Sequence, residues 1–280
     1  TVIITLGAAG STTATDLQGM SGNLALNYAL GGNIDASAAS GWNSNAGFAP
    51  VGSASTASYT GTFAGLGHTI SSLKIARQTT GNVGLFGYTG SASTIRDVVL
   101  TDANVTGRNS VGALAGYNGG NIGSSYVAQV IVTGMGTGSS GSGGLAGTNA
   151  GTIGNSHASG AVTGIDDAGG LVGVNQGTIR ASYSLVSVSN SINQAGGLVG
   201  TNEQNGSITT SYAIGGVGGT GSEMGGLVGL NNGAVSYSNA LGKVDCGNNC
   251  TAGGGLVGNN ANGISNSYAT GGVSGTGSNV

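Results

Sequence analysis

The chain has 280 residues, of which 61 are glycine and 1 is proline, and its formal net charge is only −3. This composition excludes collagen, which needs abundant proline and glycine at every third position, and it disfavours helices, because glycine costs a helix about 1 kcal/mol relative to alanine. Six basic residues are too few to cover a phosphate backbone, so we expect no nucleic-acid partner, and no apolar run approaches the ~18 residues of a membrane helix, so we expect no membrane insertion. An all-β protein is therefore predicted.

Residues 1–80 predict irregular coils. The chain starts in an apolar run without an initiating Met or a signal peptide, and we expect it to be a piece of a longer protein. Spaced aliphatic residues between positions 17 and 34, and again between 61 and 75, predict short strands. Residues 36–60 predict a protruding loop. The aromatic rings of Trp42 and Phe48 in this loop are weak candidates for stacking on a sugar. The alternative is that they plug the end of the core.

Residues 81–280 contain a regular repeat built on Gly-Gly-Leu-Val-Gly. Each copy adds an isoleucine-centred block that continues into Ser-Tyr, and then a short valine-centred block. Three short strands with glycine corners describe one coil of a single-stranded parallel β-helix, or β-solenoid. We expect about 28 residues per coil, a right-handed sense and one continuous domain. The repeated leucines lie 26 to 31 residues apart: Leu85, Leu114, Leu145, Leu171, Leu198, Leu227 and Leu256.

Stacked coils place like residues on like residues, so repeated positions predict ladders. We expect the invariant leucine to point inward. Ile264 and Tyr268 share parity, so in a regular strand the tyrosine also points inward, and a bulge between them would reverse this. The repeated asparagines predict an amide ladder at a corner, the alternative being an exposed binding row. They are Asn118, Asn149, Asn175, Asn202, Asn231 and Asn260.

The repeat resembles the GLUG motif of large secreted bacterial adhesins. The matching segments include residues 196–202, 208–212 and 226–231, and the likeness extends over nearly the whole chain. The resemblance implies a filamentous-haemagglutinin-like exoprotein, exported through an outer-membrane partner of a two-partner secretion system and folded as a β-helical fibre at the cell surface. It implies roles in attachment, aggregation or biofilm, with a host or bacterial surface glycan or protein, or a matrix polysaccharide, as partner. The family shares no catalytic residues.

Cys246 and Cys250 are separated by Gly-Asn-Asn. No histidine or second cysteine pair supports a zinc site. A turn of this length brings two thiols to disulfide distance, and a secreted protein is oxidised, so we predict a local disulfide.

The alternative functions are a carbohydrate-active β-helix enzyme, such as a polysaccharide lyase or hydrolase, and, more remotely, an ice-binding solenoid. Hydrolysis needs two facing carboxylates, but the acidic residues do not recur at the coil spacing. Asp166 and Asp167 are interpreted as solvated loop charges, and whether they hold calcium is left open. His68 and His157 are isolated, and no threonine recurs in register. We predict no catalytic, cofactor-binding or metal-binding residues and no enzyme. Candidate contact surfaces are the loops 36–60, 133–142 and 245–252.

Overall fold

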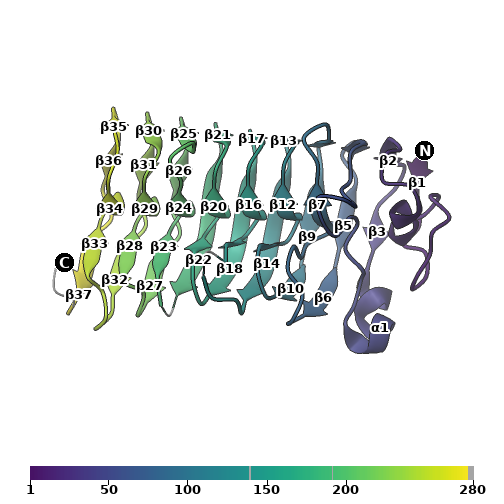
Figure 1. Ribbon diagram of the computed structural model, residues 1–280, viewed down its shortest axis with the longest axis horizontal. Coiled ribbons are helices and arrows are strands. Elements are labelled where there is room, and N and C mark those ends of the chain that lie inside the picture. Colours follow the sequence, from purple (N-terminus) through teal and green to yellow (C-terminus); the bar gives the residue numbers. More distant parts are fainter. Residues whose placement is uncertain (139, 191, 277–280) are drawn as a thin grey trace.

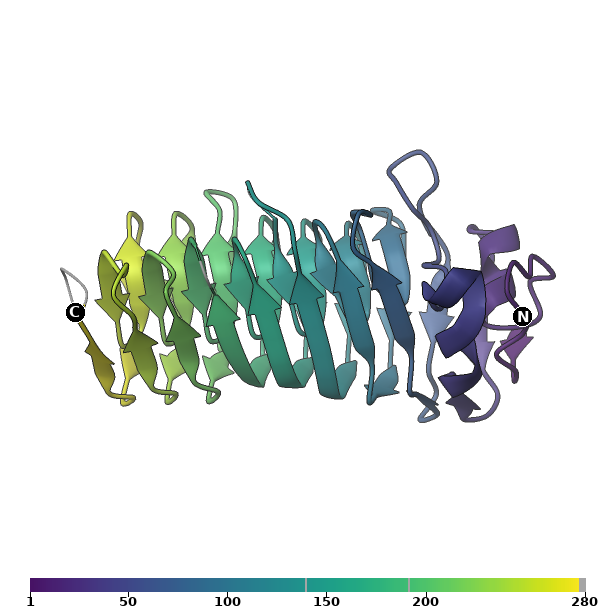
Figure 2. The same ribbon diagram turned by 90° about the horizontal axis from the view of Figure 1, so that it is seen from below.

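The chain winds into a parallel β-solenoid whose coils stack along one long axis (Figures 1 and 2). The computed structural model describes residues 1–138, 140–190 and 192–276. Residue 139, in the predicted contact loop 133–142, and residues 277–280, at the end of the predicted repeat region, lie outside the described residues. Every pairing between named strands is parallel, which confirms the predicted fold class.

Four parallel sheets run along the described part of the solenoid. The isoleucine blocks form a ten-stranded sheet, in the order β1 (Val2–Ile3), β2 (Tyr28–Leu30), β4 (Thr62–Ala64), β8 (Thr94–Arg96), β13 (Asn121–Gly123), β17 (Thr152–Gly154), β21 (Thr178–Arg180), β25 (Ser207–Thr209), β30 (Ala234–Ser236) and β35 (Ile264–Ser265). The residues after each leucine form a seven-stranded sheet, β7 (Phe86–Thr89), β12 (Ala115–Asn118), β16 (Ala146–Asn149), β20 (Val172–Asn175), β24 (Val199–Asn202), β29 (Val228–Asn231) and β34 (Val257–Asn260).

The tyrosine and valine blocks share a fourteen-stranded sheet. Its main path is β3 (Ile34–Asp35), β5 (Thr69–Ser71), β9 (Val99–Thr101), β14 (Tyr126–Gly134), β18 (His157–Gly164), β22 (Tyr183–Asn190), β26 (Tyr212–Ala213), β31 (Asn239–Ala240) and β36 (Tyr268–Ala269). Beside that path lie β6 (Lys74–Arg77), β10 (Asn104–Gly107), β27 (Val217–Gly219), β32 (Val244–Cys246) and β37 (Val273–Gly275). The fourth sheet contains β11 (Val111–Gly112), β15 (Ser142–Gly143), β19 (Ala168–Gly169), β23 (Gln194–Gly196), β28 (Glu223–Gly225) and β33 (Ala252–Gly254).

The regular coils thus contribute to four sheets, and the expectation of three strands per coil was wrong. From Leu114 onward, the glycine-rich residues before each leucine make a short strand of their own, and the chain bends at the leucine before the next strand begins. Leu114 and Ala115 are consequently both fully buried although they are consecutive. The described leucines of the repeat are fully buried except Leu256, which is partly buried in the last coil. The strand registers reproduce the leucine spacing, for example Ala115 with Ala146 and Val199 with Val228.

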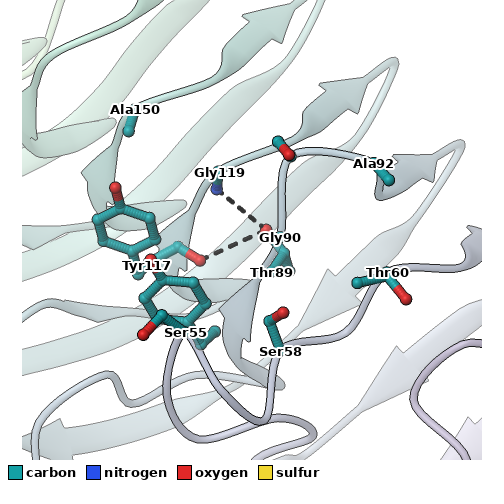
Figure 3. A pocket seen from close by; sticks show the side chains of 11 residues that line it. Ser55, Ser58, Thr60, Thr89, Gly90, Ala92, Tyr117, Gly119 and Ala150 are labelled. Carbon is teal, nitrogen blue, oxygen red and sulfur yellow. Dashed lines mark hydrogen bonds between the residues drawn. The ribbon is translucent and has the colours of Figure 1, made fainter.

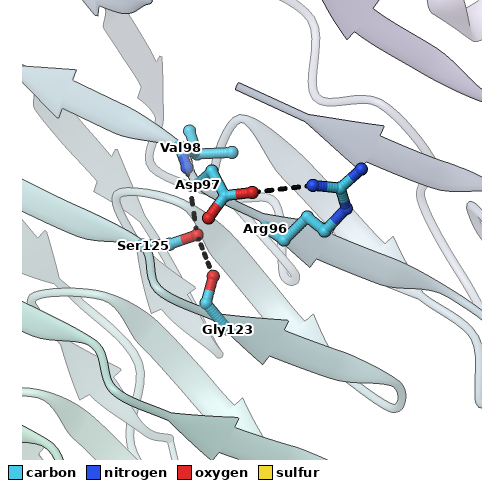
Figure 4. Close-up of polar contacts among 5 residues, drawn as sticks. All are labelled: Arg96, Asp97, Val98, Gly123 and Ser125. Carbon is cyan, nitrogen blue, oxygen red and sulfur yellow. Dashed lines mark hydrogen bonds and ion pairs between the residues drawn. The ribbon is translucent and has the colours of Figure 1, made fainter. Parts of the chain in front are cut away.

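A left-handed residue turns the chain between each isoleucine block and the tyrosine that follows. Thr210 has a φ of 50°, and Asp97 occupies the equivalent place in an earlier coil with a φ of 56°. The turn reverses the alternation, so the serine points inward and the tyrosine outward. The inward parity suggested for Tyr268 was therefore wrong, since this side chain is 59% exposed. Figure 4 shows the corner at Asp97, where the carboxylate pairs with Arg96 at 2.8 Å and the Val98 backbone N–H donates to Ser125 Oγ.

The N-terminal region adds irregular elements to the same stack. Two 3-10 helices, η1 (Gln18–Gly22) and η2 (Ser37–Gly41), and a short helical turn, α1 (Trp42–Asn45), lie at this end (Figure 1). Residues 36–60 do not protrude as a whole, because Val51 bridges to Phe86, Tyr59 bridges to Thr89, and Val51, Tyr59 and Phe86 are fully buried. An aromatic cluster formed with Tyr28 and Phe63 fills the core here.

Replacing Thr210 by glycine tests the strain at these corners. Left-handed backbone costs an ordinary residue about 1–2 kcal/mol, and glycine loses part of that gain through chain entropy. We expect Thr210→Gly to stabilise the protein by up to about 1 kcal/mol, measured by urea unfolding. The neighbouring strand substitution Thr209→Gly is the control and should destabilise. A loss of stability in Thr210→Gly equal to that in the control would contradict the assignment.

Candidate functional site

The repeated asparagines form a continuous ladder inside the solenoid. Each Nδ2 donates to the Oδ1 of the asparagine one coil on, and each of the five links from Asn118 to Asn260 is 2.8 Å long. Asn175 Nδ2 also donates to the Gly177 carbonyl of its own corner at 3.1 Å. The ladder begins at Thr89, whose hydroxyl donates to Asn118 Oδ1 at 3.0 Å. The asparagine side chains from Asn118 through Asn231 are fully buried. These amides therefore satisfy hydrogen-bonding groups at the corner and do not form an exposed binding row.

A second buried ladder, of serines, runs through the next corner. Ser156 Oγ donates to the Gly154 carbonyl at 2.9 Å and accepts the backbone N–H of Ser125 at 3.2 Å. The same pair of bonds recurs at Ser182 and Ser211. The sequence shows the serine recurring in step with the leucine, but only the left-handed turn before it reveals that its hydroxyl points inward.

Asp166 and Asp167 were predicted to be solvated loop charges, and that interpretation was wrong. They are only 2% and 5% exposed. Asp166 accepts hydrogen bonds from the Ser140 backbone N–H, at 3.1 Å, and from the Asn193 side chain. Asp167 accepts the Thr201 hydroxyl at 2.6 Å. The two carboxylates are thus held by neighbouring coils.

The pKa of Asp167 is raised to about 7. Burial is the largest cause, the Thr201 hydrogen bond opposes it, and the negative charges of Asp166, Glu203 and Glu223 add to the rise. Glu223 is itself engaged, since its two carboxylate oxygens accept the side-chain amides of Gln194 and Asn259, each at 2.7 Å. Within residues 1–138, 140–190 and 192–276, no three His, Cys, Asp or Glu side chains gather as a metal site.

An uncharged pocket of about 480 Å³ opens beside the stacked rings of Tyr88 and Tyr117 (Figure 3). The ring centroids are 4.3 Å apart and nearly parallel. Burial raises the pKa of Tyr117, and the hydrogen bond and charge of Tyr88 add to this. Hydroxyls from three segments far apart in the sequence reach the pocket. Its lining is Ser55, Ser58, Thr60, Tyr88, Thr89, Gly90, Ser91, Ala92, Tyr117, Gly119 and Ala150.

A separate aromatic column lies on the outer face of the fourteen-stranded sheet. The rings of Tyr126, His157, Tyr183 and Tyr212 stack with centroids 4.5 to 4.8 Å apart and planes within 5° of parallel. Partial burial lowers the pKa of His157. Exposed aliphatic side chains lie two residues after Tyr183, Tyr212 and Asn239, which pair in register in successive coils. They are Leu185, Ile214 and Leu241.

The other predicted residues have clear positions. Phe48 is fully buried in the core, which agrees with the second of its two predicted roles and rules out a sugar contact by its ring, and Trp42 is partly buried against the core. Cys246 and Cys250 form the predicted disulfide, with Cα atoms 5.5 Å apart, in the loop 245–252. None of the helices formed by the described residues is long and apolar enough to span a membrane.

Comparison with known proteins places the chain among β-solenoids without assigning a family. No family model matches it. A 112-residue part, 38% of the chain, is 41% identical to halomucin of Haloquadratum walsbyi, and the match covers 1% of that protein.

Two solved structures share the fold. A candidate immunoglobulin A1 protease from Bacteroides ovatus superposes with a TM-score of 0.64 over 96% of this chain and 84% of its own, at 19% identity. A structure named IgA1 protease gives a TM-score of 0.63 over 91% of this chain and 21% of its own, at 18% identity. At these identities the likeness concerns the fold alone.

Removing one amide from the asparagine ladder should be costly. Asn175→Ala leaves the Asn149 amide without its acceptor and the Asn202 oxygen without its donor, and each buried group left unpaired costs about 1–3 kcal/mol. We expect a loss of about 2–5 kcal/mol in urea unfolding. The exposed Asn121→Ala on strand β13 is the control and should change stability little. A loss in Asn175→Ala no larger than in this control would argue against the ladder.

Asp167 should make stability fall as the pH rises. Its pKa is near 3.8 when solvated and about 7 in the folded protein, so the folded state binds the proton more tightly between these values. The stabilising contribution of protonated Asp167 to the free energy of unfolding is therefore fully present below about pH 4 and is lost as the pH rises to 7.

We expect Asp167→Asn, which keeps an acceptor for Thr201, to be more stable than the wild type at pH 8, by at most about 4 kcal/mol. The difference should vanish near pH 4 in urea titrations. The exposed Asp245→Asn controls for the loss of one charge. A variant that is destabilised at pH 8 would refute the assignment.

Proposed function

We propose that this chain is a rigid segment of a large extracellular surface protein, of the GLUG-repeat, filamentous-haemagglutinin-like type, that acts in attachment, aggregation or biofilm. The single observation that carries the proposal is the unbroken templating of each coil by the next. The ten-stranded sheet runs from β1 to β35, that is, from the first strand of the chain to its last regular coil (Figure 1).

This construction supports a mechanical role. Each regular coil is joined to its neighbours by backbone hydrogen bonds in four sheets, while the asparagine and serine ladders add buried side-chain bonds parallel to the axis. Bending the rod would have to lengthen bonds in several columns at once. A repeat array of this kind grows by adding coils, so its length scales with the number of copies.

The outer surface supports attachment through many weak contacts. The column containing Tyr183 and Tyr212, and the neighbouring Leu185 and Ile214, present the same chemistry in successive coils. Side chains repeated along a stiff support engage a surface together, and linked weak contacts exceed the affinity of any one of them. Partners of this kind are a cell-surface glycan or protein, or a matrix polysaccharide.

The sequence identity to halomucin supports membership of a large protein, since the matching 112 residues make up 1% of that chain. Export through an outer-membrane partner rests on the resemblance of the repeat alone.

The proposal assigns no catalytic step to this segment. The carboxylates of Asp166, Asp167 and Glu223 are occupied by hydrogen bonds within the protein, which favours a structural use of these acids.

Bead adhesion tests the proposal. Latex beads carrying the full chain at rising density should attach to bacterial cells, to cultured epithelial cells or to polysaccharide-coated glass. The number attached should rise more steeply than linearly with density, because contacts act together. Beads carrying albumin at equal density are the control. Attachment equal to albumin on all three surfaces, or release of soluble oligosaccharide from the coated glass, would overturn the proposal.

A further inference from the structure

We propose that the pocket beside Tyr88 and Tyr117 is a binding site for a neutral saccharide. The inference deepens the proposed function, since it names the ligand class of one contact on the rod. The pocket lies where residues 55–60 of the irregular N-terminal region pass alongside the first regular coils, formed by β7 and β12. Figure 3 shows Ser55, Ser58 and Thr60 on one side of it, with Tyr117 and Ala150 on another.

The pocket offers hydroxyl groups without charge. No Lys, Arg, His, Asp or Glu is among the residues that line it. In the part of the chain that the structure describes, the hydroxyls of Ser55, Ser58 and Ser91 make no hydrogen bond to another residue. A hydroxyl both donates and accepts, so these three groups match the alternating donors and acceptors of a sugar, whereas an anionic ligand would find no cation.

Glycine and aromatic residues give the pocket its shape. A Cβ atom at Gly90 would lie 2.9 Å from Ser58 Oγ and 3.2 Å from the Thr60 methyl carbon, so glycine lets the N-terminal segment approach β7 closely. The paired tyrosines supply an apolar wall whose phenol groups interact with each other. Polar groups placed around an aromatic wall are the usual composition of a small-ligand site.

Among the described residues of the seven-stranded sheet, the pair of stacked tyrosines that lines the pocket occurs at one place. The column of Tyr88 and Tyr117 continues with Thr148 and Val174 in the following coils, which are nearly buried. The N-terminal segment that closes the pocket is outside the repeat. The pocket is therefore a local feature of this region and is distinct from the repeated aromatic column at Tyr183 and Tyr212.

Saturation-transfer NMR and calorimetry with the full chain test the inference. The probes are maltotriose, cellotriose and a β-galactotriose as neutral ligands, with trigalacturonate as the acidic counterpart. We expect at least one neutral trisaccharide to bind, and to bind at least tenfold more tightly than trigalacturonate. Absence of binding by all three, or equal or tighter binding of trigalacturonate, would overturn the proposal.

Variants locate the binding. Tyr117→Ala should weaken the neutral ligand at least tenfold, whereas Tyr237→Ala, which removes an exposed ring outside the pocket, should bind like the wild type. Should Tyr117→Ala not fold, as judged by circular dichroism, the double variant Ser58→Ala with Ser91→Ala keeps both rings and should still weaken binding at least threefold. Unchanged binding in the double variant, or equal losses in Tyr117→Ala and Tyr237→Ala, would overturn the assignment.

The bead assay separates this inference from the proposed function. Beads that attach although the chain binds no neutral trisaccharide would refute the pocket and leave the adhesive role standing. Trisaccharide binding at the pocket by a chain whose beads do not attach would leave the pocket standing and refute the adhesive role.

Discussion

Parallel hydrogen bonding between successive coils is the interaction on which the rest of this structure depends. Because each strand of the regular coils pairs in register with its counterpart 26 to 31 residues away, side chains at repeated positions lie above ones with the same surroundings. Columns of leucine fill the core without further constraint. Polar side chains in a buried column must find hydrogen-bond partners within that column. Asn175 and Ser182 do so by hydrogen bonding along the axis to the asparagine or serine of the next coil. The ladder is thus the form in which this fold tolerates polar residues inside.

The same rule governs the surface, and the exceptions to it are where distinctive chemistry occurs. Outward columns repeat a single contact, as in the stacked rings around His157. In the described part of the chain, two places depart from the repeated residue pattern. One is the turn between β18 and β19, where the carboxylates of Asp166 and Asp167 are buried and Asp167 accepts the Thr201 hydroxyl. The other is the N-terminal segment around Ser58, which closes a pocket over Tyr88. Repetition sets the length of the solenoid, while the interruptions place side-chain chemistry that does not recur from coil to coil.

The comparisons reflect what this fold demands of a sequence. Solved solenoids with 18 to 19% identity superpose over more than nine-tenths of the chain, because the architecture requires inward apolar positions, small residues at corners and a constant spacing, and little else. A β-solenoid therefore carries many activities. The higher identity to part of halomucin adds a likeness of sequence to that of fold, and the function still has to be argued from particular surfaces.

The sequence by itself determined the coil, its length and the buried leucines, because a motif that occurs in seven evenly spaced copies is a direct record of stacking. It also indicated the disulfide, since Cys246 and Cys250 lie within one turn. Only the tertiary structure decided the facing of residues near the corners. Left-handed residues such as Thr210 reverse the alternation, and their identity varies between coils, so Tyr268 points outward against its parity. Only the structure placed Phe48 in the core and Ser58 beside Tyr88, because these contacts join irregular segments whose spacing follows no period.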